Sequence, residues 1–185
     1  MFVKNIELLN FRNYEQEKAE FIDGTNIVYG DNGQGKTNLL EAVYVFTSGK
    51  SFRTVQDTEL IKFGEDFARV FINFEAFGRD NNCEIIFKSG KRKLIKLNGV
   101  PLTKTSQLLG SFPTVIFSPD ELSIITGSPE IRRKFTDISI SVLKPVYYNS
   151  LRNYLKIVKQ KNNLLKIIEK EEETLNIWNE QLAVE

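Results

Sequence analysis

Eight consecutive residues have the types and spacing that bind nucleotide phosphates: Gly30, Asp31, Asn32, Gly33, Gln34, Gly35, Lys36 and Thr37. They match the pattern G-x-x-x-x-G-K-[ST] of a phosphate-binding loop. Glycines let the backbone curl so that successive N–H groups face phosphate oxygens, and the N-terminus of a following helix adds partial positive charge. The pattern predicts that Lys36 contacts the β- and γ-phosphates and that the Thr37 hydroxyl coordinates Mg²⁺.

The segments on either side of this loop indicate whether it binds phosphate. Residues 26–29 are a short apolar run that predicts a buried strand, and residues 38–46 predict a helix whose apolar residues recur at helical spacing: Leu39, Leu40, Val43 and Phe46. The alternative is a glycine-rich turn before an ordinary helix. Strand, turn and helix in this order favour nucleotide binding.

Composition excludes several other kinds of site. The chain has 185 residues, a net charge of +1, no histidine and one cysteine, Cys83. Without histidine, catalytic triads and typical zinc sites are excluded. A single cysteine excludes an internal disulfide and suggests a reducing compartment, and its place in an apolar alternation predicts a packing role. With no signal peptide or long apolar run, we expect a cytoplasmic protein that makes no membrane contact.

The remaining sequence up to residue 117 predicts more strands. Residues 3–11 and 17–22 are expected to form strands, and Asp23-Gly24 a turn into the strand at residues 26–29. Strands this close in sequence are expected to be antiparallel. Residues 57–63 are expected to form a short helix. Residues 66–103 read as an antiparallel meander because residues 68–76 alternate between apolar and polar types. Its expected turns are Asn81-Asn82, Ser89-Gly90 and Asn98-Gly99.

The meander also carries a basic cluster, which consists of Lys88, Lys91, Arg92, Lys93 and Lys96. Such a cluster fits two interpretations. In the first, the cluster binds a nucleic-acid backbone. In the second, its charges are solvated on one face of the hairpin or protect an edge strand from pairing with another chain.

Residues 114–117 predict a strand, and Ser118 and Pro119 predict the start of a helix. Asp120 and Glu121 follow an apolar run, as a metal-binding acid would, but we favour the interpretation that they belong to the helix cap. A second helix is expected to start at Ser128-Pro129 and to end near Leu143, before Pro145.

The helical segment has an uneven charge. Residues 131–170 hold ten Lys or Arg and two acids, whereas residues 171–185 hold five glutamates and no base. This asymmetry indicates either a DNA-binding arm or a solvated helical face. The candidate DNA contacts of the whole chain are Lys91, Arg92, Lys93, Arg132, Arg133, Arg152, Lys156 and Lys159.

The amphipathic pattern of Leu175, Trp178 and Leu182 predicts a helix that needs a partner, as in a fragment of a longer protein or an arm within an assembly.

Four stretches together resemble the RecF family of bacterial recombination-mediator ATPases, which is related to ABC and SMC heads. They are residues 8–14 (LLNFRNY), 30–42 (GDNGQGKTNLLEA), 47–54 (TSGKSFRT) and 117–137 (FSPDELSIITGSPEIRRKFTD). The first two would also suit SMC-like ATPases, and the last two are more particular to RecF.

The resemblance implies an α/β fold: a P-loop ABC/SMC-type ATPase head with a mixed sheet and an antiparallel meander, followed by a helical lobe. Residues 1–117 would form the ATP-binding lobe and residues 118–185 an incomplete helical lobe. Members bind ATP with Mg²⁺, dimerise around the nucleotide, and bind DNA at single-strand gaps. They work with RecR and RecO to load RecA, within DNA repair and the SOS response. Arg12 and Asn13 match a motif that lies near the nucleotide in related heads.

The family's signature motif and its acidic Walker B pair have no counterpart here, so no catalytic residue is identified in this chain. We expect the whole protein to be a weak ATPase and this chain alone to bind ATP without hydrolysing it. Two other functions stay open: a nucleotide-gated protein-interaction module that does not bind DNA directly, and a P-loop kinase that acts on a small molecule.

Overall fold

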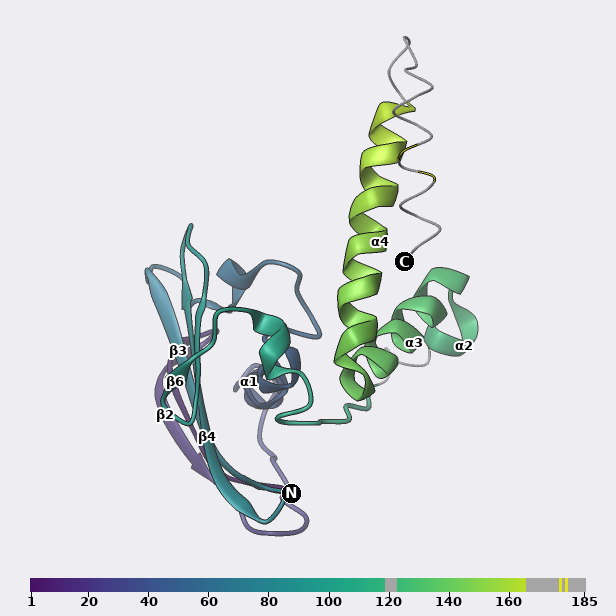
Figure 1. The fold of residues 1–185 in the computed structure, drawn as a ribbon. Helices are drawn as coiled ribbons and strands as arrows, with labels where there is room; N and C mark the ends of the chain where they lie inside the picture. The colour runs from purple at the N-terminus through teal and green to yellow at the C-terminus, as the bar shows by residue number, and fades with distance from the viewer. Residues whose placement is uncertain (119–122, 166–176, 178, 180–185) are drawn as a thin grey trace. The chain divides into compact units, whose positions relative to one another are not determined.

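The computed structural model describes residues 1–118, 123–165, 177 and 179. The chain divides into two compact units, Met1–Ile116 and Phe117–Glu185 (Figure 1). The predicted cap acids Asp120 and Glu121, and the predicted apolar stripe of Leu175, Trp178 and Leu182, lie outside the described residues.

The first unit is built on a six-stranded sheet with the strand order β2-β1-β3-β4-β5-β6. Every neighbouring pair in this sheet is antiparallel. The strands are β1 (Phe2–Phe11), β2 (Tyr14–Glu20), β3 (Phe67–Ala76), β4 (Arg79–Lys88), β5 (Leu94–Leu97) and β6 (Val100–Pro101). The predicted β1–β2 pair and the predicted meander are therefore confirmed.

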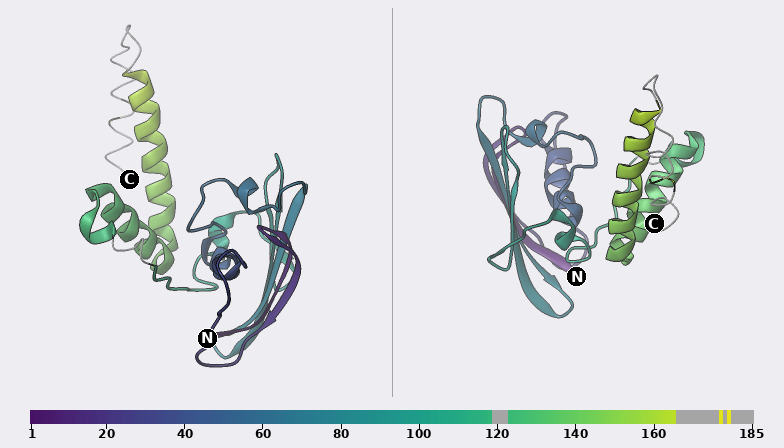
Figure 2. Two further views of the ribbon diagram at one scale, coloured as in Figure 1. Left: turned by 180° about the vertical axis from the view of Figure 1, so that it is seen from behind. Right: turned by 45° about the horizontal axis from the view of Figure 1, so that its top comes forward.

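Helix α1 (Lys36–Ser48) packs on the concave face of the sheet, as the views in Figure 2 show. The alternation in β3 places Ala68, Val70, Ile72 and Phe74 in the core, where they meet Val45 and Phe46 of α1. Cys83 of β4 lies in the same core, and burial raises the pKa of its thiol to about 12. Leu40, which was predicted to lie on the apolar face of α1, is exposed, and Ala42 is buried instead.

Two short 3₁₀ turns complete the first unit: η1 (Asp57–Leu60) and η2 (Thr105–Leu108). The first forms where a short helix was predicted. Its last residue is tied to β1, because the backbone N–H of Arg12 donates to the Leu60 carbonyl over 2.9 Å.

The hairpin turns show how well turn chemistry can be predicted. Asn98-Gly99 joins β5 to β6 with positive φ at both residues, as the Asn-Gly pair predicts. The predicted turn at Asn81-Asn82 is wrong: both residues lie within β4, and Phe77-Gly78 makes the turn. Asn82 is held in the strand because its N–H donates to the Asn98 side chain over 2.8 Å.

Two predicted strands, at residues 26–29 and 114–117, are absent from the described residues. Neither segment pairs with a described strand, and Ile27, Tyr29 and Val115 are 80%, 89% and 97% exposed. A strand is stable only where a neighbour satisfies its backbone N–H and C=O groups, and in the described part of the chain neither segment has such a neighbour. The parallel strands expected of a mixed sheet are therefore not formed.

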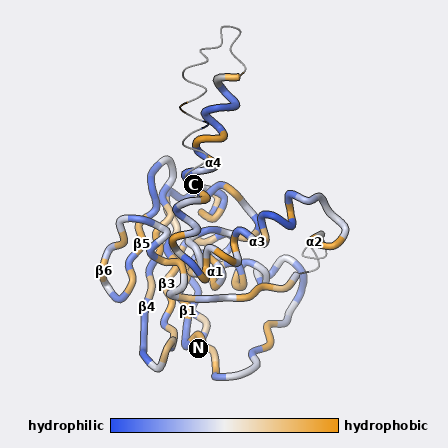
Figure 3. Tube along the Cα trace, turned by 45° about the vertical axis from the view of Figure 1, so that its right-hand side comes forward, coloured by the Kyte–Doolittle hydropathy of each residue, from blue (hydrophilic) through white to orange (hydrophobic). Residues whose placement is uncertain are grey.

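Within the described part of the second unit, the helices are α2 (Ser123–Thr126), α3 (Pro129–Leu143) and α4 (Pro145–Leu164). Helix α3 starts and ends as predicted, with Ser128 before Pro129, although the Ser128 side chain makes no cap hydrogen bond. The side chain of Ile157 is buried on α4. Figure 3 shows that hydrophilic residues interrupt the apolar ones along α4. No helix in the described ranges has both the length and the hydropathy that a membrane span requires.

Candidate nucleotide-binding site

The predicted phosphate-binding loop runs directly into the N-terminus of α1. Gly35 is the N-cap residue, and the Leu39 N–H donates to the Gly35 carbonyl over 2.9 Å, which starts the helical hydrogen bonds. The N–H groups of Lys36, Thr37 and Asn38 precede that bond and so have no acceptor within the helix. Their position gives the loop the donors and the helix dipole that phosphate binding uses.

Gly35 has to be a glycine because two neighbouring side chains lie against it. Its φ is +104°, and a Cβ atom there would lie 2.9 Å from the Asn13 amide and from the Tyr14 ring. The Tyr14 hydroxyl also donates to the Gly35 carbonyl over 3.2 Å. The turn between β1 and β2 therefore rests directly on the last glycine of the loop.

Lys36 folds back over the loop that it follows. Its ammonium donates to the carbonyls of Gly30 and Asp31, each over 2.7 Å. The ammonium is thus held by two neutral acceptors that phosphate oxygens can replace, because charged acceptors form the stronger bonds. The contact of Lys36 with the β- and γ-phosphates stays a prediction.

The predicted metal ligand, Thr37, is exposed at the first turn of α1. Within the described residues no three His, Cys, Asp or Glu side chains gather closely enough to hold a metal ion. Mg²⁺ in nucleotide sites usually keeps several waters and takes few protein ligands beside the phosphates. A single hydroxyl at the loop fits such an ion.

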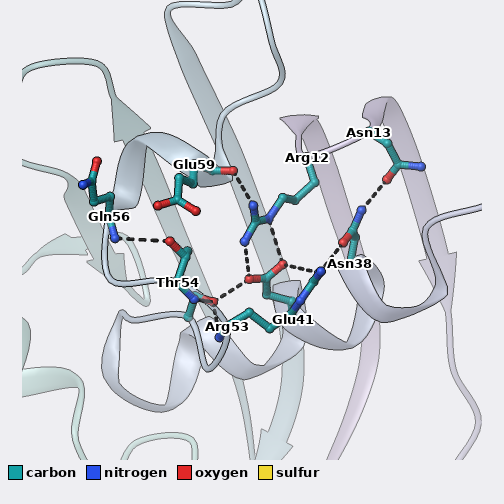
Figure 4. A network of polar contacts seen from close by, with 9 residues as sticks. Arg12, Asn13, Asn38, Glu41, Arg53, Thr54, Gln56 and Glu59 are labelled. Carbon is teal, nitrogen blue, oxygen red and sulfur yellow. Dashed lines mark hydrogen bonds and ion pairs between the residues drawn. The ribbon is translucent and has the colours of Figure 1, made fainter. Parts of the chain in front are cut away.

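Beside the loop, a buried carboxylate joins three segments of the chain. Glu41 of α1 is fully buried, and Figure 4 shows Arg12 and Arg53 pointing toward it. Arg12 makes a bidentate contact, with Nε donating to Glu41 Oε2 over 2.9 Å and Nη2 donating to Oε1 over 2.7 Å. The Ser51 hydroxyl donates to Oε1, and Arg53 Nη1 lies 3.4 Å from Oε2.

The same network reaches the residue that follows Thr37. Arg53 Nη1 donates to Asn38 Oδ1, and Asn38 Nδ2 donates to Asn13 Oδ1, each over 2.8 Å. Asn13, Asn38 and Arg53 are thus connected at the first turn of α1. The structure places Asn13 against Gly35 of the loop.

Arg12 does not contact the loop as its neighbour Asn13 does. Besides Glu41, its guanidinium donates to the Glu59 carbonyl over 2.7 Å, so its contacts are to the protein itself.

Sequence reasoning did not single out Glu41, Asn38 or Ser51. One signal was available: Glu41 is the only charged residue within the otherwise largely apolar run that follows the loop, between Leu39 and Phe46.

Some of the predicted DNA contacts on the first unit are engaged within the protein. The Lys93 ammonium pairs with both Asp57 oxygens at 2.8 and 2.9 Å, and its side chain is 11% exposed. Arg92 donates to the Thr103 carbonyl. Lys91 is exposed. Because the charge of Lys93 is neutralised by a partner, this residue is a poor candidate for binding phosphate.

The predicted contacts on the second unit divide in the same way. Arg132 donates to the carbonyls of Ile124 and Gly127 over 3.3 and 3.0 Å, so it ties α2 to α3. Four others are exposed: Arg133 on α3, and Arg152, Lys156 and Lys159 on α4. The last three are spaced four and three residues apart and therefore share one helix face.

Comparison with known proteins agrees with this geometry. Residues 2–124 match the family described as the RecF/RecN/SMC N terminal domain. The chain is 46% identical over 187 residues to the DNA replication and repair protein RecF of Ruminiclostridium cellulolyticum, and 45% identical over 185 residues to that of Thermoanaerobacter pseudethanolicus. Each alignment covers 99% of this chain, and the chain spans about half the length of these relatives (50% and 51%).

Solved structures show the same relationship. A structure of the recombination mediator protein RecF with ATP superimposes with a TM-score of 0.92 at 41% identity, covering 98% of this chain and 50% of that one. An SMC ATPase structure, at 22% identity and a TM-score of 0.59, covers 75% of this chain and 99% of the other, and shows the shared fold alone. The predicted α/β head fold and the resemblance to RecF are confirmed. The chain belongs to the RecF/RecN/SMC N-terminal domain family.

Proposed function

We propose that the chain is the ATP-binding part of a RecF-type DNA replication and repair protein. The observation that supports this most strongly is the phosphate-binding loop at the N-terminus of α1, with the Lys36 ammonium held over it by two carbonyls. The likeness to a RecF–ATP structure supports ATP as the nucleotide.

In this proposal each residue of the loop has a defined task. The N–H groups that open α1 bind phosphate oxygens, and Lys36 exchanges its two carbonyl acceptors for the β- and γ-phosphates. Thr37 contributes its hydroxyl to Mg²⁺, which neutralises phosphate charge when it is bound. Asp31, Asn32 and Gln34 are part of the loop, and Asn13 packs against Gly35 beside it.

The chain covers about half the length of its relatives, so the whole protein's activity is a further part of the proposal. We expect the remaining half to supply strands beside residues 26–29 and 114–117, together with the acids that activate water. ATP would then join two copies, and the dimer would bind DNA at single-strand gaps in the cytoplasm, where RecO and RecR help it to load RecA.

For DNA, we propose the exposed face of α4 formed by Arg152, Lys156 and Lys159. Arg133 on α3 and Lys91 on the meander are secondary candidates, while Arg92, Lys93 and Arg132 are left out because their charges contact the protein. Cations on one helix face release counterions when they meet a phosphate backbone, which makes such binding depend on salt.

The test is the affinity of the full-length protein for gapped DNA, measured with and without ATP, in the wild type and in Lys36→Ala. We expect ATP to raise the affinity of the wild type and to leave that of the variant unchanged. Equal affinities in all four measurements would refute the proposal.

One observation favours the alternative of a nucleotide-gated protein-interaction module. Large apolar side chains are exposed on two helices of the second unit: Phe135, Ile138 and Leu143 on α3, and Tyr154 and Leu155 on α4. Exposed apolar groups near charged ones are typical of protein interfaces. In this alternative, neutralising Lys156, Lys159 and Lys166 leaves DNA binding intact and weakens a protein complex.

A further inference from the structure

Glu41 is the one fully buried charged side chain in the described part of the chain, and three segments meet at it. Arg12 comes from the turn directly after β1, Glu41 from the second turn of α1, and Ser51 and Arg53 from the segment after α1. Burying a carboxylate is costly unless its charge is paired and its oxygens are hydrogen-bonded, and here both conditions are met. Each carboxylate oxygen is shared between Arg12 and one partner from the later segment.

The network extends from Glu41 to the loop along two routes. Arg53 contacts Glu41 and also Asn38, which is the residue after Thr37. Arg12 is followed by Asn13, which contacts Asn38 and lies against Gly35. Both routes end within the first turn of α1, where the phosphate-binding loop joins the helix.

We propose that Glu41 is a positioning residue for the nucleotide site: it fixes Arg12 and Arg53 so that Asn13 and Asn38 hold Gly35, Lys36 and Thr37 in the geometry that receives phosphates. The inference rests on the proposed ATP binding. Glu41 does not touch the nucleotide itself, because its oxygens are occupied by Arg12, Ser51 and Arg53. Its role is to hold the turn at Arg12 and Asn13, and the segment 51–54, each in a single conformation.

The segment 51–54 is ordered by the same carboxylate. The Ser51 hydroxyl accepts hydrogen bonds from the N–H groups of Arg53 and Thr54 over 2.8 and 3.1 Å while it donates to Glu41. Loss of the carboxylate charge would therefore free Arg53 from Glu41 and, through it, loosen Asn38. Small displacements of groups that bind a ligand can cost an order of magnitude or more in function.

The experiment measures the affinity for Mg²⁺-ATP of the full-length protein in three forms: wild type, Glu41→Gln and Glu84→Gln. Glu84 is a matched control, because it accepts Arg69 Nε over 2.6 Å and lies 3.1 Å from Lys96 Nζ, on the sheet face away from α1. Affinity is measured well below the unfolding temperature of each form. We expect Glu41→Gln to weaken ATP binding by about tenfold or more, and Glu84→Gln to leave it unchanged.

Equal ATP affinity of Glu41→Gln and wild type would overturn the inference while leaving the proposed function intact. If the wild type itself binds no ATP, the proposed function fails, and the inference fails with it. If both glutamine variants lose affinity equally, Glu41 has only a general structural role and the inference is again overturned.

A second pair of variants keeps the test decisive if Glu41→Gln does not fold. Ser51→Ala removes the hydroxyl that donates to Glu41 and accepts from the N–H groups of Arg53 and Thr54. Arg53→Lys keeps the charge while removing the planar guanidinium, and both variants leave the Arg12–Glu41 pair in place. We expect each to weaken ATP binding by about threefold or more, because each loses at least one net hydrogen bond. Wild-type affinity in both would overturn the inference.

Discussion

The carboxylate of Glu84 lies on the outer face of the sheet, between two cations of neighbouring strands. Arg69 of β3 donates to it, and Lys96 of β5 approaches its other oxygen. The hydrogen bond from Arg69, with the help of Lys96, holds the pKa of this carboxyl below the ordinary value of 4.5. Lys96 therefore belongs to a cross-strand ion network, and the basic cluster read from the sequence is partly neutralised in the fold.

This arrangement predicts how stability depends on pH. Because the pKa of Glu84 is lower in the folded state, its contribution is present above 4.5 and is lost as the pH falls through the folded value. We expect Glu84→Gln to destabilise the protein by about 1 kcal/mol at neutral pH, as partly exposed ion pairs do. Urea unfolding of wild type and variant checks this: the difference in unfolding free energy should shrink as the solution is made acidic, and a difference that grows with acid would contradict it.

Single residues can be predicted from the sequence where their own chemistry decides their role. Lys36, Thr37 and the glycines of the loop were predicted because their spacing follows from phosphate geometry. Glu41 was not singled out, and Lys93 was grouped with the basic cluster without its partner, because the contacts of a charged side chain depend on residues far away in the sequence. Lys93 meets Asp57 across 36 residues, and Arg12 meets Glu41 across 29.

Among the elements, α1 and the meander strands could be predicted because their periodicities are strong and their core faces lie within this chain. Residues 26–29 and 114–117 have the apolar character of strands but are exposed here. The residue types of a segment indicate only that it favours a strand. Whether the strand forms depends on which neighbouring strands are available to pair with it. The turn at Phe77-Gly78 was missed because Asn81-Asn82 has the more usual turn residues.

Helix α4 carries the most direct test of DNA binding at the level of an element. Replacing Arg152, Lys156 and Lys159 by glutamine removes three exposed cations from one face without changing helix propensity much. We expect the affinity for DNA to fall and the slope of log affinity against log salt to decrease by about 2 to 3, since each phosphate contact contributes about 0.9.

The control for this experiment is a triple glutamine variant of Lys18, Lys62 and Lys104, which lie in the first unit away from α4 in sequence. It should keep both the affinity and the salt slope of the wild type. Equal losses in the two variants would mean that net charge, and not the face of α4, governs binding. An unchanged slope in the α4 variant would favour the protein-interaction alternative.

At the scale of the whole molecule, the two units have different characters. The first holds the core, the sheet and the phosphate-binding loop, and the second is a set of helices with many exposed apolar and basic side chains. A chain that covers half the length of its relatives is expected to expose surfaces that the rest of the protein covers. The sequence identified the family through motifs spread over both units.

The central claim is that the loop of residues 30–37 binds ATP, and calorimetric titration with Mg²⁺-ATP tests it most directly. The account predicts saturable binding to the wild type, and in Lys36→Ala an affinity at least tenfold lower, because a charged hydrogen bond contributes about 1.5–3 kcal/mol. Binding of equal strength to both proteins, or no binding to the wild type, would contradict it.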